Sequence, residues 1–135
     1  MNKNVRLLKA LADETRLRLL LLLGEKELFV CQLMAVTGLS QSLVSRSLSL
    51  LEREGLLDSR REGKHVFYRL KKELPGLGRA VMDGLAGQRE KTGSFAPDRA
   101  NLDMFCRRFQ RGTACDMAMV KEFIAFKTKN HKRSQ

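Results

Sequence analysis

The chain has 135 residues, and its 26 Lys and Arg against 15 Asp and Glu give a formal net charge of +11. This length fits one compact domain with an added element, and a hydrophobic fraction of 43% argues against global disorder. The longest apolar run, Leu19 to Leu23, is far shorter than the roughly 18 residues of a membrane span. The charged N-terminus lacks the apolar core of a secretory signal. We therefore expect a cytoplasmic protein.

The reactive side chains favour a binding protein over an enzyme. Three scattered cysteines do not make a disulfide framework, and in a reducing cytoplasm we expect free thiols. The chain has only two His, no phosphate-binding Gly loop, no HExxH motif, and no nucleophile–base pair at a defined spacing. The strong positive charge instead favours a polyanionic partner, either nucleic acid or an anionic membrane surface.

Hydrophobic spacing predicts four helices in the first 54 residues. The first covers residues 4–12, and the second begins after an Asp13 N-cap, ends at Gly24 and is buried because its leucines cover more than one face. Residues 28–37 and 41–54 form the third and fourth, separated by Gly38 and an N-cap at Ser40. Two short helices joined by such a turn are typical of a helix-turn-helix. The inward positions of the fourth helix are Val44, Leu48 and Leu51.

The outer face of the fourth helix has the composition of a DNA-reading surface. Its small polar side chains allow close approach to the major groove, and Arg46 can donate two hydrogen bonds to a guanine edge. A plain solvent-exposed face is the alternative, but it would more often carry Glu and Lys than Ser, a poor helix former. The predicted DNA contacts on this helix are Ser40, Gln41, Ser42, Ser45, Arg46 and Ser49.

Residues 56–70 change to the alternating pattern of β-strands, with Glu62-Gly63 at the predicted hairpin tip. A basic hairpin that follows a helix-turn-helix is typical of a wing, which lies along phosphates or enters a minor groove. The alternative is that these charges protect an edge strand. The predicted wing contacts are Arg60, Arg61, Lys64 and His65.

Further helices are predicted towards the C-terminus. Pro75 suits the first turn of one helix, and residues 86–97 have the composition of a linker. Asp98 is the predicted N-cap of a helix that Gly112 ends, and Thr113 is the predicted N-cap of a last helix. That last helix has Val120, Phe123 and Ile124 as its apolar positions and leads into a basic tail, Lys127 to Arg133.

Three segments resemble the ArsR/SmtB family of bacterial repressors, and within it the arsenical-resistance repressors. They are LKALADETRLRLLLLL (8–23), GLSQSLVSRSLSLLEREGLL (38–57) and RREGKHVFYRL (60–70). The resemblance covers about residues 5–85. It implies a mainly α winged helix-turn-helix with a small β-hairpin wing (α+β).

The resemblance also implies a domain organisation and a mode of action. Residues 1–88 would form the DNA-binding and dimerisation domain, and residues 89–135 a C-terminal helical extension with a basic tail. The family dimerises through its first and last helices, here 4–12 and 74–88. A two-fold dimer predicts an inverted-repeat operator, with half-sites about one helical turn apart. Family members repress an operon and leave the DNA when an inducer binds.

The inducer residues of the family match this chain only in part. The arsenical repressors carry ELCVCDLC, whereas residues 27–34 read ELFVCQLM, so Cys31 matches and Phe29 and Met34 replace thiols. The zinc-sensing members use Asp, His and Glu ligands, and residues 72–90 contain no His, so that zinc site is not expected.

The three cysteines are the candidate ligands for an inducer. As(III) and Sb(III) are soft ions that prefer thiolates, and one thiol does not hold them tightly. A relocated site at Cys31, Cys106 and Cys115 would lie within or between subunits, and Cys115 near a helix N-terminus would favour the thiolate. The alternative is that cysteines simply fill core. No obligatory cofactor is expected.

Three functions remain open. The first is an operator-specific dimeric repressor released by arsenite or antimonite. The second is a transcriptional regulator that responds to thiol oxidation at Cys106 and Cys115. The third is a winged-helix protein-interaction module that has lost DNA binding, against which Gln41, Ser45, Arg46 and the basic wing argue.

Overall fold

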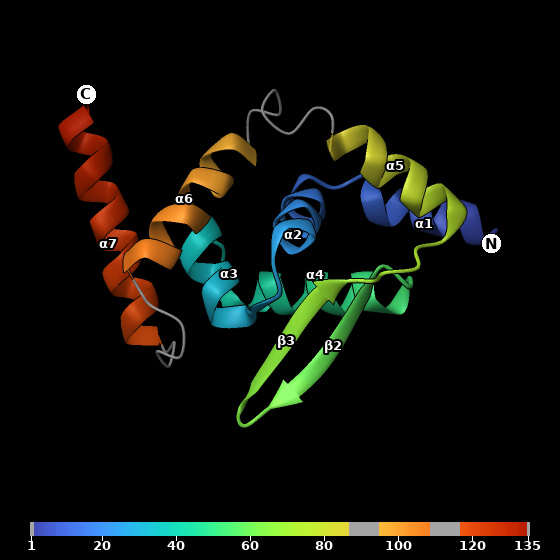
Figure 1. Cartoon of the computed structure of the whole chain (residues 1–135), viewed down its shortest axis with the longest axis horizontal. Helices are drawn as coiled ribbons and strands as arrows, with labels where there is room; N and C mark the ends of the chain where they lie inside the picture. The colour runs from blue at the N-terminus through green and yellow to red at the C-terminus, as the bar shows by residue number, and fades with distance from the viewer. Residues whose placement is uncertain (1, 87–94, 109–116, 135) are drawn as a thin grey trace.

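The computed structural model describes residues 2–86, 95–108 and 117–134, which fold mainly into helices with one small antiparallel sheet (Figure 1). The strand order in the sheet is β1-β3-β2. This architecture confirms the expected winged helix-turn-helix. The elements are α1 (Lys3–Leu11), α2 (Glu14–Glu25), β1 (Leu28–Phe29), α3 (Val30–Thr37), α4 (Gln41–Arg53), β2 (Leu57–Glu62), β3 (His65–Leu70), α5 (Gly76–Ala86), α6 (Phe95–Arg108) and α7 (Met117–Ser134).

The central helix α2 begins as predicted and ends later than predicted. Asp13 caps it, because one carboxylate oxygen accepts a hydrogen bond from the Arg16 backbone N–H at 3.0 Å. The expected end at Gly24 is wrong, because α2 continues to Glu25 and the Lys26 N–H still donates to Leu22 O. The five consecutive leucines are all buried, which confirms that α2 is the centre of the core.

The predicted third helix starts two residues later than expected, because Leu28 and Phe29 form the short strand β1. Leu28 and Phe29 are both buried, and they pair with Tyr68 and Phe67 of β3. The Gln32 side chain accepts a hydrogen bond from the Phe29 N–H at 3.1 Å, which closes the start of α3. Pairing between residues forty positions apart leaves no trace in local hydrophobic spacing, so helix periodicity masked this strand.

The helix-turn-helix has the predicted caps. α3 ends at Gly38, whose φ of 77° is the left-handed conformation that glycine adopts at helix C-termini. Ser40 Oγ accepts a hydrogen bond from the Leu43 N–H at 3.2 Å and so caps α4. The inward positions Val44, Leu48 and Leu51 are fully buried. These contacts hold α4 by one face and leave the opposite face to solvent.

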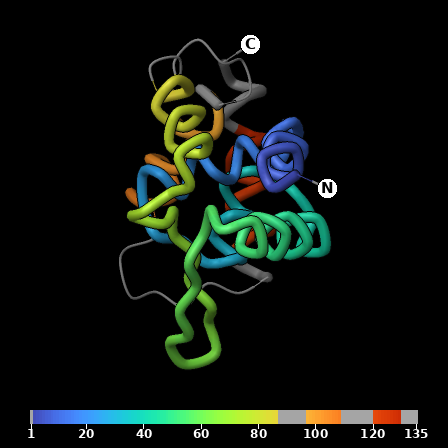
Figure 2. Tube along the Cα trace, turned by 90° about the vertical axis from the view of Figure 1, so that its right-hand side faces the viewer, coloured from blue at the N-terminus to red at the C-terminus, as the bar shows by residue number. Residues whose placement is uncertain are grey.

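The wing is the two-stranded part of the sheet, and it projects from the helical body (Figure 2). Strands β2 and β3 pair from Leu57↔Leu70 to Glu62↔His65. This register places Gly63 and Lys64 in the turn, so the tip predicted at Glu62-Gly63 is shifted by one residue. Gly63 has φ of 61°, as the first position of a type II′ hairpin turn requires.

The C-terminal helices differ from their predicted boundaries. α6 begins at Phe95, so residues 95–97 are helical rather than part of a linker, and Asp98 lies in the first turn instead of capping it. α7 continues to Ser134, so the segment from Lys127 to Arg133 is helical rather than a loose tail. The predictions for Gly112, Thr113 and Cys115 lie outside the described residues.

Helices α6 and α7 pack against the helix-turn-helix through α3, at the end of the molecule opposite α1 and α5 (Figure 1). Their apolar side chains join the same core cluster as the leucines of α2 and α3. The fully or nearly fully buried members from these two helices are Leu102, Phe105, Val120 and Phe123. None of the helices within residues 2–86, 95–108 and 117–134 has the length and apolar character needed to cross a membrane.

Candidate nucleic-acid interface

The outer face of α4 presents most of the predicted DNA contacts to solvent. Arg46 is exposed, and its Nε donates to Ser42 O on the same helix at 3.3 Å, so its side chain lies along α4. Ser45 is half-buried, and the Ser40 hydroxyl is occupied in capping the helix. A further serine, Ser47, faces the core and is not part of this surface. The exposed members of the predicted set on and before α4 are Ser40, Gln41, Ser42, Arg46 and Ser49.

Arg60 differs from the other basic wing residues because two carboxylates hold it. It forms ion pairs with Glu27, next to β1, and with Glu62 on its own strand, and its guanidinium lies 4.6 Å from the centre of the Phe67 ring. Hydrogen bonds to these carboxylates raise the pKa of Arg60 above its ordinary value. In this structure the charge of Arg60 is therefore balanced locally, and Glu27, which lies outside the wing, is a partner of Arg60 that sequence patterns did not reveal.

His65 lies on the wing surface and also belongs to a small aromatic cluster. Its ring stacks on Phe29 at 4.4 Å between centroids, and Phe29 meets Phe67 edge-to-face at 5.0 Å. Phe29, at a position where the arsenical motif has cysteine, is thus buried between the wing and the body. The cluster therefore packs the tip half of the hairpin against β1 and so against the helical body.

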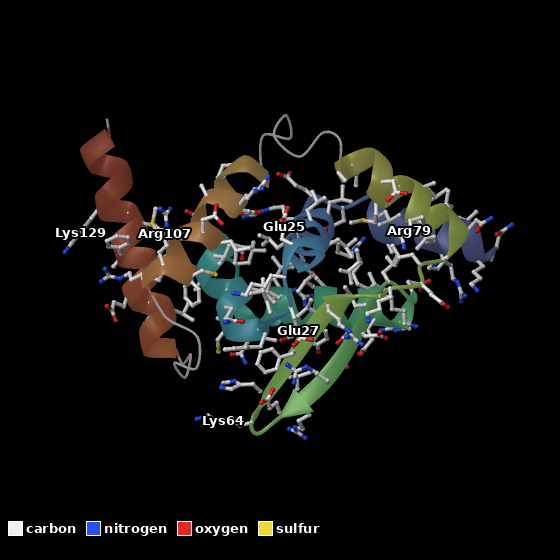
Figure 3. All side chains as sticks on the ribbon, in the orientation of Figure 1. Glu25, Glu27, Lys64, Arg79, Arg107 and Lys129 are labelled. Carbon is white, nitrogen blue, oxygen red and sulfur yellow. The ribbon has the colours of Figure 1, made fainter. Side chains whose placement is uncertain are left out.

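Arg61 and Lys64 are exposed, and Figure 3 shows Lys64 at the very tip of the hairpin. A lysine there suits a phosphate contact, which adds affinity without reading sequence. We expect Lys64→Ala to weaken binding to operator and random duplexes alike, and to lower the slope of log affinity against log salt concentration by about 1. Fluorescence anisotropy at several salt concentrations measures both quantities.

Lys129→Ala is the matched control, because Lys129 is an exposed lysine on α7, away from the wing (Figure 3). It removes the same charge and should leave the salt slope unchanged. A Lys64→Ala slope equal to that of the control would exclude a phosphate contact at the tip.

The two cysteines that the structure describes lie on different elements. Cys31, in the first turn of α3, and Cys106, in α6, are both half-buried free thiols, and their helices pack against each other. Lys26 Nζ donates a hydrogen bond to Cys106 Sγ at 3.3 Å. Met34, at the second position where the arsenical motif has cysteine, is buried in the core. Among the described residues, which exclude Cys115, no three His, Cys, Asp or Glu side chains are grouped so that they could hold a metal ion.

Comparison with known proteins agrees with this geometry. The family model "Bacterial regulatory protein, arsR family" matches residues 13–59, which span α2 to the first half of β2. The solved homodimeric winged helix-turn-helix DNA-binding domain of Mb0332 from Mycobacterium bovis matches with a TM-score of 0.55 and 32% identity. That match covers 64% of this chain and 80% of the other.

Two curated relatives are regulators by name. The chain is 39% identical over 108 residues to the arsenic resistance transcriptional regulator ArsR1 of Pseudomonas putida, which covers 79% of this chain and 83% of that protein. It is 46% identical over 80 residues to the arsenical resistance operon repressor of Escherichia coli, over 58% of this chain and 68% of that protein. The chain belongs to the ArsR family of bacterial transcriptional regulators.

Proposed function

We propose that this protein is a homodimeric repressor that binds an inverted-repeat operator and is released by As(III) or Sb(III). The observation that carries the DNA-binding part is the exposed polar face of α4, which is followed directly by a basic wing. In this arrangement α4 enters the major groove, where Arg46 reads a base edge. Ser40, Gln41, Ser42, Ser45 and Ser49 supply base or backbone contacts, and the wing residues Arg60, Arg61, Lys64 and His65 lie along the flanking DNA.

An open apolar surface on α1 supports the homodimer. Among the described residues, Val5 and Leu8 are the exposed large hydrophobic residues, at 40% and 48%. Leu77, Val81 and Leu85 on α5 are only partly buried. Both helices lie at the same end of the molecule (Figure 1), and a second copy would cover both. The similar Mb0332 domain from Mycobacterium bovis is described as homodimeric.

The positions of these surfaces support a proposed division of the chain into two parts. Residues 1–88 carry the DNA-reading face and the dimerisation surface, and residues 89–135 form an extension that covers α3. The extension also contributes two of the three cysteines. Conversion of the operator-bound form to a released form requires that the inducer bind the released form more tightly, typically by about 1–3 kcal/mol.

The proposed inducer site uses thiolates. Both curated relatives are named for arsenic or arsenical resistance, and As(III) and Sb(III) prefer sulfur ligands. Cys31 and Cys106 lie on packed helices, and Cys115 is the third proposed ligand. Lys26 Nζ donates a hydrogen bond to Cys106 Sγ, so an ion bound at Cys106 would alter this contact. The altered contact would link the site to the end of α2.

The test is fluorescence anisotropy on a duplex from the gene's own promoter, in a phosphine reductant, with arsenite as titrant. We expect release at about one arsenite per subunit. Replacement of Cys31, Cys106 or Cys115 by Ser should in each case abolish release. Operator affinity should stay within about twofold, because none of the three belongs to α4 or to the wing strands in the sequence.

Other outcomes would select a different function. Tight operator binding that arsenite does not change, but that peroxide reverses in the absence of reductant, would replace the inducer with thiol oxidation. Specific binding that neither reagent changes would exclude both triggers. Absence of specific DNA binding would favour a protein-interaction module.

A further inference from the structure

The C-terminal end of α3 is held by side chains from three other helices. Val36 O accepts hydrogen bonds from Asn101 Nδ2 of α6 at 3.3 Å and from Lys127 Nζ of α7 at 3.2 Å. The next carbonyl, Thr37 O, accepts one from Arg18 Nη2 of α2 at 3.1 Å. The last carbonyls of a helix have no partner within the helix, so these side chains satisfy groups that would otherwise need water.

A buried carboxylate orients the arginine of this group. Asp98, in the first turn of α6, is 1% exposed, and it accepts hydrogen bonds from Arg18 Nε and Nη2, both at 2.8 Å. The paired, charge-assisted geometry holds the guanidinium plane rigidly. The hydrogen bond from Arg18 to Asp98 is also the main reason that the pKa of Arg18 is raised. We call Arg18, Asp98, Asn101 and Lys127 the α3 clamp.

The clamp places two cations where the α3 dipole is negative. Lys127 is half-buried with its Nζ 5.4 Å from the centre of the Phe123 ring, and burial lowers its pKa. The nearby Asp98 opposes that shift. A cation at a helix C-terminus is stabilised by the aligned peptide dipoles, so Arg18 and Lys127 suit this position.

Docking of the extension does not require these polar contacts. Leu102, Phe105, Val120 and Phe123 already bury an apolar surface against the core. Yet the polar side chains converge on two consecutive carbonyls that lie directly before the helix-turn-helix turn at Gly38. Only residues 38–40 separate the end of α3 from α4, so a change in the direction of α3 at this end is passed on to α4.

We infer that Asp98, Asn101 and Lys127 are positioning residues for DNA recognition, and that through them the C-terminal extension sets the orientation of α4. The inference rests on the proposed DNA-binding function. A tilted α4 would lose its aligned base contacts but keep its charge. The clamp should therefore affect affinity for the operator and not affinity for DNA of random sequence.

The experiment compares two clamp variants with controls of equal charge. Lys127→Met is matched by Lys129→Met, because Lys129 is exposed and points outward from α7 (Figure 3). Asp98→Asn is matched by Asp103→Asn, because Asp103 is exposed on α6. For each variant, Kd is measured on operator and on a random duplex of equal length, and Tm is measured alongside. Lys127→Arg, which retains the cation, serves as the rescue variant.

Relative to its control, each clamp variant should bind operator roughly tenfold more weakly, the cost of one misaligned base contact. Affinity for the random duplex should match the control, and Lys127→Arg should recover most of the operator affinity. If Asp98→Asn does not fold, Lys127→Met and the milder Asn101→Ala still decide the question.

A lower Tm with an operator-to-random ratio equal to that of the controls would overturn the inference and leave the clamp a purely stabilising contact. A wild-type protein that binds operator and random DNA equally would instead overturn the proposed function, and the inference with it.

Discussion

Phe123→Ala is expected to lower the free energy of unfolding by about 3–5 kcal/mol, the usual cost of removing a buried aromatic ring. Phe123 is fully buried, and its ring meets Phe105 edge-to-face at 5.2 Å between centroids. The substitution removes that contact and leaves a cavity between α7 and the rest of the core. The substitution would also remove the contact between the Lys127 ammonium group and the Phe123 ring. Urea denaturation followed by circular dichroism measures the change.

The shape of the same unfolding curve tests whether the extension is part of one cooperative unit. Phe123 belongs to the core cluster that includes the leucines of α2 and α3, so we expect one transition with an unchanged m-value and a lower midpoint. Phe126→Ala is the control, because Phe126 is only half-buried and the loss should be smaller. An early, separate transition in the variant would show that residues 89–135 unfold independently.

Arg46→Ala is expected to weaken operator binding by about 1–3 kcal/mol and to leave affinity for random DNA nearly unchanged. Arg46 is exposed on the outer face of α4, on a helix whose other face is anchored by buried Val44, Leu48 and Leu51. A long hydrogen bond to Ser42 O on its own helix holds the side chain weakly, so the side chain can leave the helix and bind a guanine. Anisotropy titrations on the two duplexes give both affinities.

Arg53→Ala is the control for Arg46→Ala, because it shows how much DNA affinity is lost when one positive charge is removed from α4. Arg53 is an exposed arginine in the last turn of the same helix, so its removal changes the net charge equally. We expect a similar, small loss on both duplexes. Equal losses on operator and random DNA for Arg46→Ala would exclude a base-reading role for Arg46 and shift that role to Gln41 and the serines.

The features that sequence reasoning predicted correctly depend on neighbours within a few residues. Asp13 and Ser40 cap helices because their oxygens reach an N–H three residues ahead, and Gly38 ends α3 because glycine adopts positive φ at little cost. The inward face of α4 follows from a spacing of three and four residues. The wing strands and the exposed reading face were predictable for the same reason.

The remaining features depend on partners far away in the chain, and only the tertiary structure decided them. Leu28 and Phe29 become a strand because β3 lies beside them. Asp98, the predicted N-cap, instead forms an ion pair with Arg18, eighty residues away. Glu27, which precedes β1, forms an ion pair with Arg60 of β2. Local sequence patterns indicate backbone geometry and the apolar face of a helix or strand. The partner of a charged side chain depends instead on which residues the fold brings close to it. The sequence therefore determined which face of α4 is polar and exposed, and the fold determined which charged side chains are held in ion pairs.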